Sequence, residues 1–197
     1  CLRWLDANPP NLDEARKAVN RMIEEGTRAG EIVRRIRALS GKSDSQKAPV
    51  DLNALVTDVA SLLDRELAGS QVELRMELAK ELPAVTGDPV QLQQVIINLA
   101  MNAIEAMRGA GNGTRNLWIR TRRSDARTAT IAVEDSGPGI PAGDPEQLFT
   151  AFYTTKKEGL GIGLSISRTI VEAHGGRLSA ANSERGAIFQ IELPQNT

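Results

Sequence analysis

A row of polar side chains interrupts the otherwise apolar stretch from Gln91 to Met107. At about 3.6 residues per helical turn, the amides and the carboxylate of this stretch fall on one face of a predicted helix: Gln91, Gln94, Asn98, Asn102 and Glu105. A buried amide without a hydrogen bond costs about 1–3 kcal/mol, so such a row needs partners. A polar ligand with a hydrated metal ion would supply them, and hydrogen bonds to neighbouring loops would do so equally well.

A second candidate site is a carboxylate that follows a predicted strand. From Ala129 to Val133 every second residue is apolar, and Asp135 continues this face toward the apolar layer. The two glycines of Ser136-Gly-Pro-Gly139 would let a ligand approach the backbone closely. Taken alone, the same residues also fit an ordinary turn after a strand.

A third candidate is the glycine-rich run from Gly159 to Gly163, which opens a predicted helix that ends near His174. Free backbone N–H groups and the positive end of the helix would meet there, an arrangement that suits phosphate. The run does not fit the dinucleotide-binding fingerprint, because Leu164 stands where its third glycine is expected. The preceding stretch, Pro141 to Glu158, has no clear periodicity and predicts a lid. We expect that lid to dock through its aromatic residues: Phe149, Phe152 and Tyr153.

Hydrophobic periodicity predicts the elements that would position these residues. The predicted helices are Asp13–Ser40, Asp51–Leu67, Gln91–Met107 and Gly163–His174. The predicted strands are Val72–Leu78, Ala84–Val85, Asn116–Arg123, Thr128–Glu134, Arg177–Ala181 and Ile188–Leu193.

The first predicted helix carries a heptad seam, since its apolar and small residues recur in alternating steps of four and three from Ala15 to Ser40. Residues 1–7 are predicted to be the end of a preceding helix, stopped by the turn-forming Asn8-Pro9-Pro10-Asn11. A hairpin of this short helix end and one full helix cannot bury such a seam alone, so we expect an antiparallel bundle completed by upstream residues or by another chain. A helix that packs only on its own domain is the alternative. Because the chain begins at Cys1 rather than Met, we expect it to be trimmed or to be part of a longer protein.

The composition narrows the class of protein. The chain has 197 residues, 41% of them hydrophobic and 25% charged, with a net charge of −1, which fits an ordinary globular protein and gives no support to nucleic-acid binding. One Cys and one His exclude a disulfide framework and the usual zinc ligand sets. No apolar run approaches about 18 residues. We expect a cytoplasmic location, with a membrane anchor elsewhere in the parent protein left open.

The order and spacing of four motifs resemble those of sensor histidine kinases of two-component systems. The motifs are Asn98-x3-Asn102, Asp135-Ser-Gly-Pro-Gly139, Phe149-Thr-Ala-Phe-Tyr-Thr-Thr-Lys156 and Gly159-Leu-Gly-Ile-Gly163. They are similar to the N, first glycine, F and second glycine boxes of that family. The segments N-A-I-E-A-M and F-Y-T-T-K are most similar to the corresponding motifs of the nitrogen- and oxygen-sensing subtype.

This resemblance implies an α+β fold. Residues 46–197 would form a two-layer α/β sandwich of the histidine kinase and gyrase type that binds ATP. Residues 1–45 would form part of an antiparallel helical hairpin for dimerisation and phosphotransfer that lacks the acceptor His. The parent protein would be a homodimer through this hairpin.

The resemblance also assigns roles to residues. Asn102 would coordinate Mg²⁺, Asn98 would contact phosphate or the waters of the ion, and Lys156 would carry charge toward the phosphates, which makes these three the catalytic candidates. Asp135 would accept a hydrogen bond from the adenine amino group. The nucleotide site would further include Gly137, Gly139, Ile140, Phe152, Thr155, Gly159, Leu160, Gly161, Gly163 and Leu164.

The implied activity is transfer of the γ-phosphoryl group of Mg-ATP to a His upstream of this chain, for relay to an Asp of a response regulator. His174 lies at a predicted helix end and is not expected to be the acceptor. Ala187 stands where many relatives have Thr, so one hydroxyl near the nucleotide would be missing.

Two alternatives remain. ATP hydrolases of the gyrase, heat-shock chaperone and mismatch-repair group share the fold, but they place a Glu that activates water where Asn98 stands. The second alternative is a noncatalytic module for nucleotide binding or dimerisation.

Overall fold

The structure is a computed structural model, and it describes residues 2–5, 10–22, 47–109, 113–124, 127–143, 145–154 and 161–195. The chain divides into two compact units, Cys1–Ser43 and Asp44–Thr197.

The first unit contains the short helix α1 (Leu2–Leu5) and a helix over residues 12–22. The side chain of Asn11 caps the second helix by accepting a hydrogen bond from the Glu14 N–H at 3.1 Å. Of the predicted seam, Ala15 is buried, whereas Val19 and Met22 are exposed. The seam beyond residue 22 lies outside the described residues, so its pairing stays a prediction.

The second unit is built on a five-stranded sheet with the order β2-β4-β5-β7-β6. Its strands are β2 (Val72–Glu77), β4 (Arg115–Arg123), β5 (Thr128–Asp135), β6 (Arg177–Asn182) and β7 (Ala187–Pro194). The β2 strand runs parallel to β4, and the other neighbouring pairs are antiparallel. A separate antiparallel pair joins β1 (Ala48–Val50) to β3 (Val85–Gly87).

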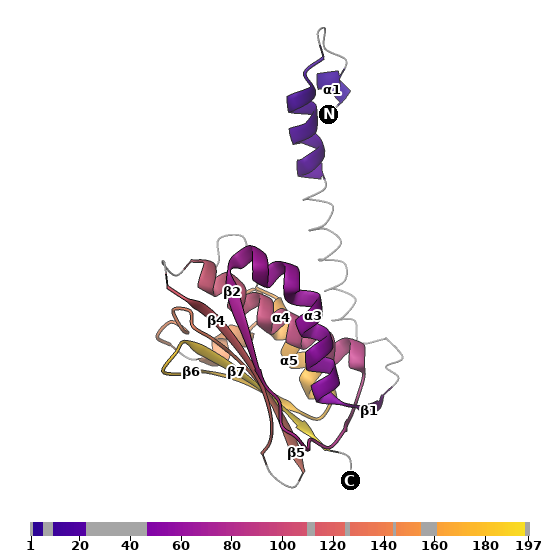
Figure 1. Cartoon of the computed structure of the whole chain (residues 1–197), viewed down its shortest axis with the longest axis vertical. Coiled ribbons are helices and arrows are strands. Elements are labelled where there is room, and N and C mark those ends of the chain that lie inside the picture. Colours follow the sequence, from indigo (N-terminus) through magenta and orange to yellow (C-terminus); the bar gives the residue numbers. More distant parts are fainter. Residues whose placement is uncertain are drawn as a thin grey trace. The chain divides into compact units, whose positions relative to one another are not determined.

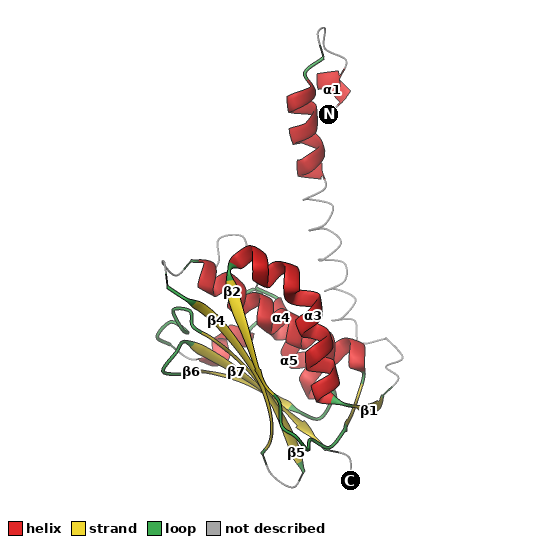
Figure 2. Cartoon of the chain, in the orientation of Figure 1, coloured by secondary structure: helices red, strands yellow, loops and turns green. Residues whose placement is uncertain are grey.

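Three helices cover one face of this sheet, as Figures 1 and 2 show: α3 (Leu52–Ser70), α4 (Pro89–Arg108) and α5 (Gly163–Ala173). Two of them begin at an aspartate whose carboxylate accepts hydrogen bonds from the first turn, Asp51 in α3 and Asp88 in α4. The predicted two-layer α/β sandwich is therefore confirmed.

The α4 helix lies between α3 and α5 and packs on strands β4 and β5. Its apolar residues are buried as their helical spacing predicts: Leu92, Val95, Ile96, Leu99, Ala100, Ala103, Ile104 and Met107. The polar stripe is less buried than the sequence predicts, because Asn98 and Asn102 are half-buried and Glu105 is exposed. These three side chains therefore keep part of their surface accessible.

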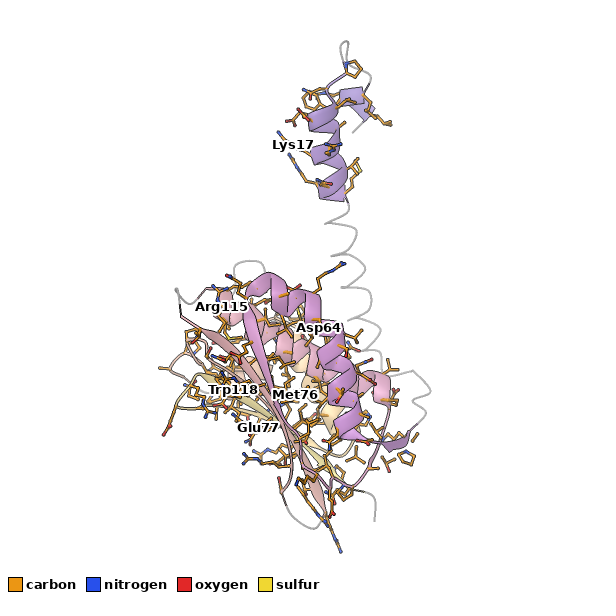
Figure 3. The ribbon with its side chains drawn as sticks, viewed as in Figure 1. Lys17, Asp64, Met76, Glu77, Arg115 and Trp118 are labelled. Carbon is orange, nitrogen blue, oxygen red and sulfur yellow. The ribbon has the colours of Figure 1, made fainter. Side chains whose placement is uncertain are left out.

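Arg120 of β4 and Glu134 of β5 form a buried ion pair, which two more exposed charged residues extend. Glu134 is paired with the guanidinium groups of Arg120 and Arg185, and Arg120 also lies 3.2 Å from a carboxylate oxygen of Glu77. Arg185 lies over the ring of Trp118, which Figure 3 labels together with Glu77. Burial alone would raise the pKa of Glu134, but its hydrogen bonds and the charges of Arg120 and Arg185 hold that pKa below its usual value.

One predicted irregular stretch contains regular structure. The short 3-10 helix η1 (Pro145–Phe149) lies within the segment expected to be a lid without periodicity. A single turn of this kind is too short to produce a repeating hydrophobic pattern.

Candidate functional site

Asp135, the last residue of β5, forms the centre of the site and is 2% exposed. Its Oδ1 atom accepts hydrogen bonds from the backbone N–H groups of Gly137 at 2.8 Å and Ala187 at 3.4 Å. Burial raises the pKa of this carboxyl group, the two backbone N–H groups oppose the rise, and the neighbouring Glu134 adds to it. The predicted inward carboxylate is thus confirmed, in a setting that disfavours its charged form.

Two glycines allow the backbone to pass close to this carboxylate. A Cβ atom on Gly137 would lie 2.8 Å from Asp135 Oδ1 and 3.5 Å from Met107 Cγ of α4. A Cβ atom on Gly186 would lie 2.4 Å from the backbone oxygen of Asp135. The sequence indicates the role of Gly137 but misses Gly186, whose only local signal is its place in a turn before a strand.

Asn182, at the end of β6, holds the loop that follows Asp135 and was also missed by the sequence. Its Oδ1 accepts a hydrogen bond from the Ile140 N–H at 2.6 Å, and its Nδ2 donates one to the Ile140 backbone oxygen at 3.0 Å. Gly139 has a φ of +77°, and a Cβ atom there would lie 2.7 Å from Asn182 Oδ1. These hydrogen bonds therefore fix Gly139 and Ile140 beside the end of β5, where Asp135 lies.

Asn98 and Asn102 lie one helical turn apart on α4 and are both half-buried. The Asn98 Nδ2 donates a hydrogen bond to the Ser167 Oγ of α5 at 2.9 Å. A Cβ atom on Gly163 would lie 2.7 Å from Asn98 Oδ1, so the first turn of α5 adjoins this amide. The structure thus brings Asn98 of the polar row against the N-terminus of α5, as a joint site requires.

The N-terminus of α5 has the character of an anion site. Its N-cap, Ile162, makes no side-chain capping hydrogen bond among the described residues. Gly163 and Leu164 of the first turn are half-buried. Uncapped N–H groups and the positive helix end favour a phosphate group at this place.

A backbone hydrogen bond joins the lid to the residue two positions before α5. The Phe152 N–H donates a hydrogen bond to the Gly161 backbone oxygen at 2.9 Å, and both residues have positive φ angles, 69° and 65°. A Cβ atom on Gly161 would lie 2.5 Å from the backbone oxygen of Tyr153, so a glycine is required there.

The lid aromatics do not dock as a group, which corrects the sequence-based expectation. Phe149 is buried and its ring lies 4.0 Å from the Arg168 guanidinium carbon, whereas Phe152 is 79% exposed. The helical turn η1 directs Phe149 onto α5, but the strained backbone at Phe152 turns its ring outward. The remaining predicted site residues of the lid lie outside the described residues: Thr155, Lys156, Gly159 and Leu160.

The amides Asn98 and Asn102 fit a magnesium ion that is held jointly with phosphate. Among the residues that the structure describes, no group of three or more His, Cys, Asp or Glu side chains could hold a metal. Amide oxygens are suitable ligands for Mg²⁺, which usually keeps several waters and binds substrate phosphates. No helix in the described part of the chain is long and apolar enough to cross a membrane.

Comparison with known proteins places this geometry in a family. The model of the histidine kinase-, DNA gyrase B- and HSP90-like ATPase family matches residues 87–197. The chain is 43% identical over 194 residues to the sensor histidine kinase TmoS of Ectopseudomonas mendocina, covering 98% of this chain and 20% of TmoS. Across eight curated relatives, the chain spans between 20% and 42% of the relative's length.

Solved structures agree with this assignment. The catalytic domain of the histidine kinase ThkA is 31% identical, with a TM-score of 0.68 over 77% of this chain and 99% of that domain. ThkA in complex with the response regulator protein TrrA is 29% identical, with a TM-score of 0.77 over 99% of this chain and 55% of ThkA. The chain therefore belongs to the histidine kinase-, DNA gyrase B- and HSP90-like ATPase family, and TmoS and ThkA, to which it is similar, are histidine kinases.

Proposed function

We propose that this chain is the catalytic portion of a two-component sensor histidine kinase that uses Mg-ATP. Residues 46–197 would bind the nucleotide, and residues 1–45 would form part of the dimerisation and phosphotransfer hairpin. The γ-phosphoryl group would pass to a His outside this chain and then to an Asp of a response regulator. The observation that carries the proposal is the buried Asp135 carboxylate beside two close backbone approaches, at Gly137 and Gly186.

This carboxylate suits the amino group of adenine. A buried carboxylate is costly unless it is hydrogen-bonded, and an amino donor from a ligand would offset part of that cost. The backbone N–H groups of Gly137 and Ala187 fix Oδ1, so the orientation of the carboxylate is set before a base arrives. Asn182 holds Gly139 and Ile140 as the wall beside the base.

The amides and the helix end suit the phosphates. Asn102 and Asn98 would hold Mg²⁺ and its waters, Gly161, Gly163 and Leu164 would lie along the phosphates, and Lys156 would bring positive charge. Mg²⁺ held by Asn102 and Asn98 would offset the charge of the phosphates during an in-line transfer. The Asn98 amide is already fixed at Ser167, 2.9 Å away, and would exchange this partner for the ion or a phosphate.

Asn98 also favours transfer to a protein acceptor over hydrolysis. An ATP hydrolase needs a general base that takes a proton from water, and a neutral amide cannot do this. The partner is inferred from ThkA, whose solved complex contains a response regulator. Exposed Val19 and Met22 are compatible with homodimerisation through the hairpin.

Calorimetry with ADP and Mg²⁺ tests nucleotide binding. We expect micromolar to submillimolar affinity, about −5 to −8 kcal/mol, with GTP binding poorly. The absence of both binding heat and a thermal shift at millimolar ADP would overturn the proposal. Binding without transfer to a supplied His-containing acceptor domain would favour a noncatalytic nucleotide-binding module.

A further inference from the structure

His174, the single His of the chain, is buried where α5 ends. Its Nδ1 lies 2.7 Å from the Ile170 backbone oxygen, and its Nε2 lies 2.9 Å from the Asp88 backbone nitrogen. A carbonyl oxygen can only accept and a backbone N–H can only donate, so Nδ1 carries the proton and Nε2 accepts. The hydrogen bonds therefore select a neutral imidazole protonated on Nδ1.

The partner of Nε2 is the backbone N–H of Asp88, the N-cap residue of α4. Asp88 is the N-cap of α4, and its carboxylate accepts hydrogen bonds from the N–H groups of Val90 and Gln91. A Cβ atom on Gly87 would lie 2.8 Å from the His174 Cδ2, so the imidazole is packed closely against the chain just before this cap. The imidazole thus joins the beginning of α4 to the end of α5.

The candidate phosphate site lies at a second contact between the same two helices, where Asn98 of α4 meets the first turn of α5. Asn98 lies ten residues after Asp88, about 15 Å along α4. There its Nδ2 bonds Ser167 of α5, and Gly163 approaches its Oδ1 so closely that a Cβ atom would lie 2.7 Å away. A small sliding of α5 along α4 would therefore separate Asn98 from the N–H groups of the first turn of α5.

We propose that His174 is a positioning residue for nucleotide binding: its Nε2 bond to Asp88 fixes the register of α5 against α4 and so places Gly163 beside Asn98. This inference rests on the proposed function. When Asn98 leaves Ser167 for an ion or a phosphate, the His174 bond continues to hold the two helices in register. The imidazole acts through its acceptor nitrogen and does not touch the nucleotide.

The tautomer can be measured directly on the whole chain. Because the chain has one His, the imidazole nitrogen and carbon-bound proton signals in a long-range ¹H–¹⁵N correlation spectrum need no assignment. We expect the proton on Nδ1 at neutral pH, although free imidazole side chains favour Nε2. A proton on Nε2 would overturn the proposal, whatever the behaviour of the variants.

Two substitutions of His174 test the acceptor nitrogen, Nε2, independently of the donor nitrogen, Nδ1. His174→Gln places an amide oxygen near the position of Nε2, where it can accept from Asp88, whereas His174→Asn reaches only the region of Nδ1. Glu172→Gln, on an exposed side chain two residues away, is the matched control. Circular dichroism would establish that each chain is folded before binding is measured.

The affinity for ADP with Mg²⁺, measured by calorimetry, gives the functional result. Losing one hydrogen bond that holds the register should weaken binding by about three- to tenfold in His174→Asn. His174→Gln and Glu172→Gln should stay within about twofold of wild type. Equal affinity of His174→Asn and wild type, or equal weakening of both His174 variants, overturns the positioning role alone. A wild-type chain that binds no ADP overturns the proposed function itself.

Discussion

The Oδ1 atom of Asp135 lies 2.8 Å from the backbone nitrogen of Gly137, two residues further along the chain. The carboxylate at the end of the buried strand β5 thus accepts a hydrogen bond from the loop after Asp135, which would enclose the base. The same burial raises the pKa of Asp135, so the orientation for a ligand is gained at some cost in stability.

Asp135→Asn should weaken ADP binding and stabilise the fold at neutral pH. Binding should fall by about 1.5–3 kcal/mol, because an amide replaces a charged acceptor. Since the folded-state pKa is raised, the ionised carboxylate opposes folding above that pKa, and this cost disappears as the pH falls through it. Denaturant unfolding should show a stability gain at pH 7 that shrinks on acidification. Unchanged ADP affinity would reduce Asp135 to a turn residue.

Asn102→Ala should remove most of the magnesium dependence of ATP binding and leave the fold intact, because Asn102 is half-buried and uncharged. Gln91→Ala, on the same polar row about 16 Å along the helix, is the control. Titrations of ATP with and without Mg²⁺ measure the effect. A variant whose ATP affinity still rises as steeply with Mg²⁺ as that of wild type contradicts the assignment.

Gly186→Ala should damage both the fold and the nucleotide site. Its Cβ atom would lie 2.4 Å from the Asp135 backbone oxygen, so the end of β5 or the beginning of β7 must move. Overpacking of this kind costs about 1–3 kcal/mol. Gly69→Ala in α3 is the control, since nothing lies within 4 Å of the added atom. Thermal unfolding and ADP titration of both variants test this, and a Gly186→Ala chain as stable as Gly69→Ala would refute it.

Glu134→Gln should destabilise the fold by about 3 kcal/mol, because it leaves the buried Arg120 guanidinium without its main partner. The pKa of Glu134 is lowered, so its contribution is present above the ordinary value of 4.5 and is lost as the pH falls through the folded-state pKa. The difference from wild type in urea unfolding should therefore narrow below about pH 4.5. Glu73→Gln, which removes an exposed pair with Arg75, should cost at most about 1 kcal/mol.

Incubated with labelled ATP and Mg²⁺, this chain should form no acid-labile phosphohistidine. Its single His is buried with both ring nitrogens in hydrogen bonds, whereas in-line transfer needs the acceptor nitrogen about 3 Å from phosphorus. Fusion to an upstream helix that carries a His should restore labelling. Stable label on the unfused chain that disappears in His174→Gln would place the chemistry at His174 instead.

Local patterns in the sequence were enough to predict single elements of this architecture. The spacing of apolar residues predicted α4 and its polar row, and the alternation in β5 predicted that Asp135 points inward. Both patterns are set by the period of one element, so they can be read without knowing its neighbours. The four ordered motifs then indicated the family, although the nitrogen- and oxygen-sensing subtype and the roles of the individual site residues, Lys156 and the other lid residues included, stay predictions.

Residues far apart in the sequence complete the site, and they meet only through the packing of strands and helices. Ala187 reaches Asp135 across 52 positions, Asn182 reaches Ile140 across 42, and His174 reaches Asp88 across 86. Such contacts depend on the order and register of the strands and on how α5 packs against α4. Local periodicity does not encode these relations, because each strand has the same period of two whichever neighbour it pairs with. Gly186, Asn182 and the acceptor nitrogen of His174 therefore become visible only when the sheet and its helices are assembled.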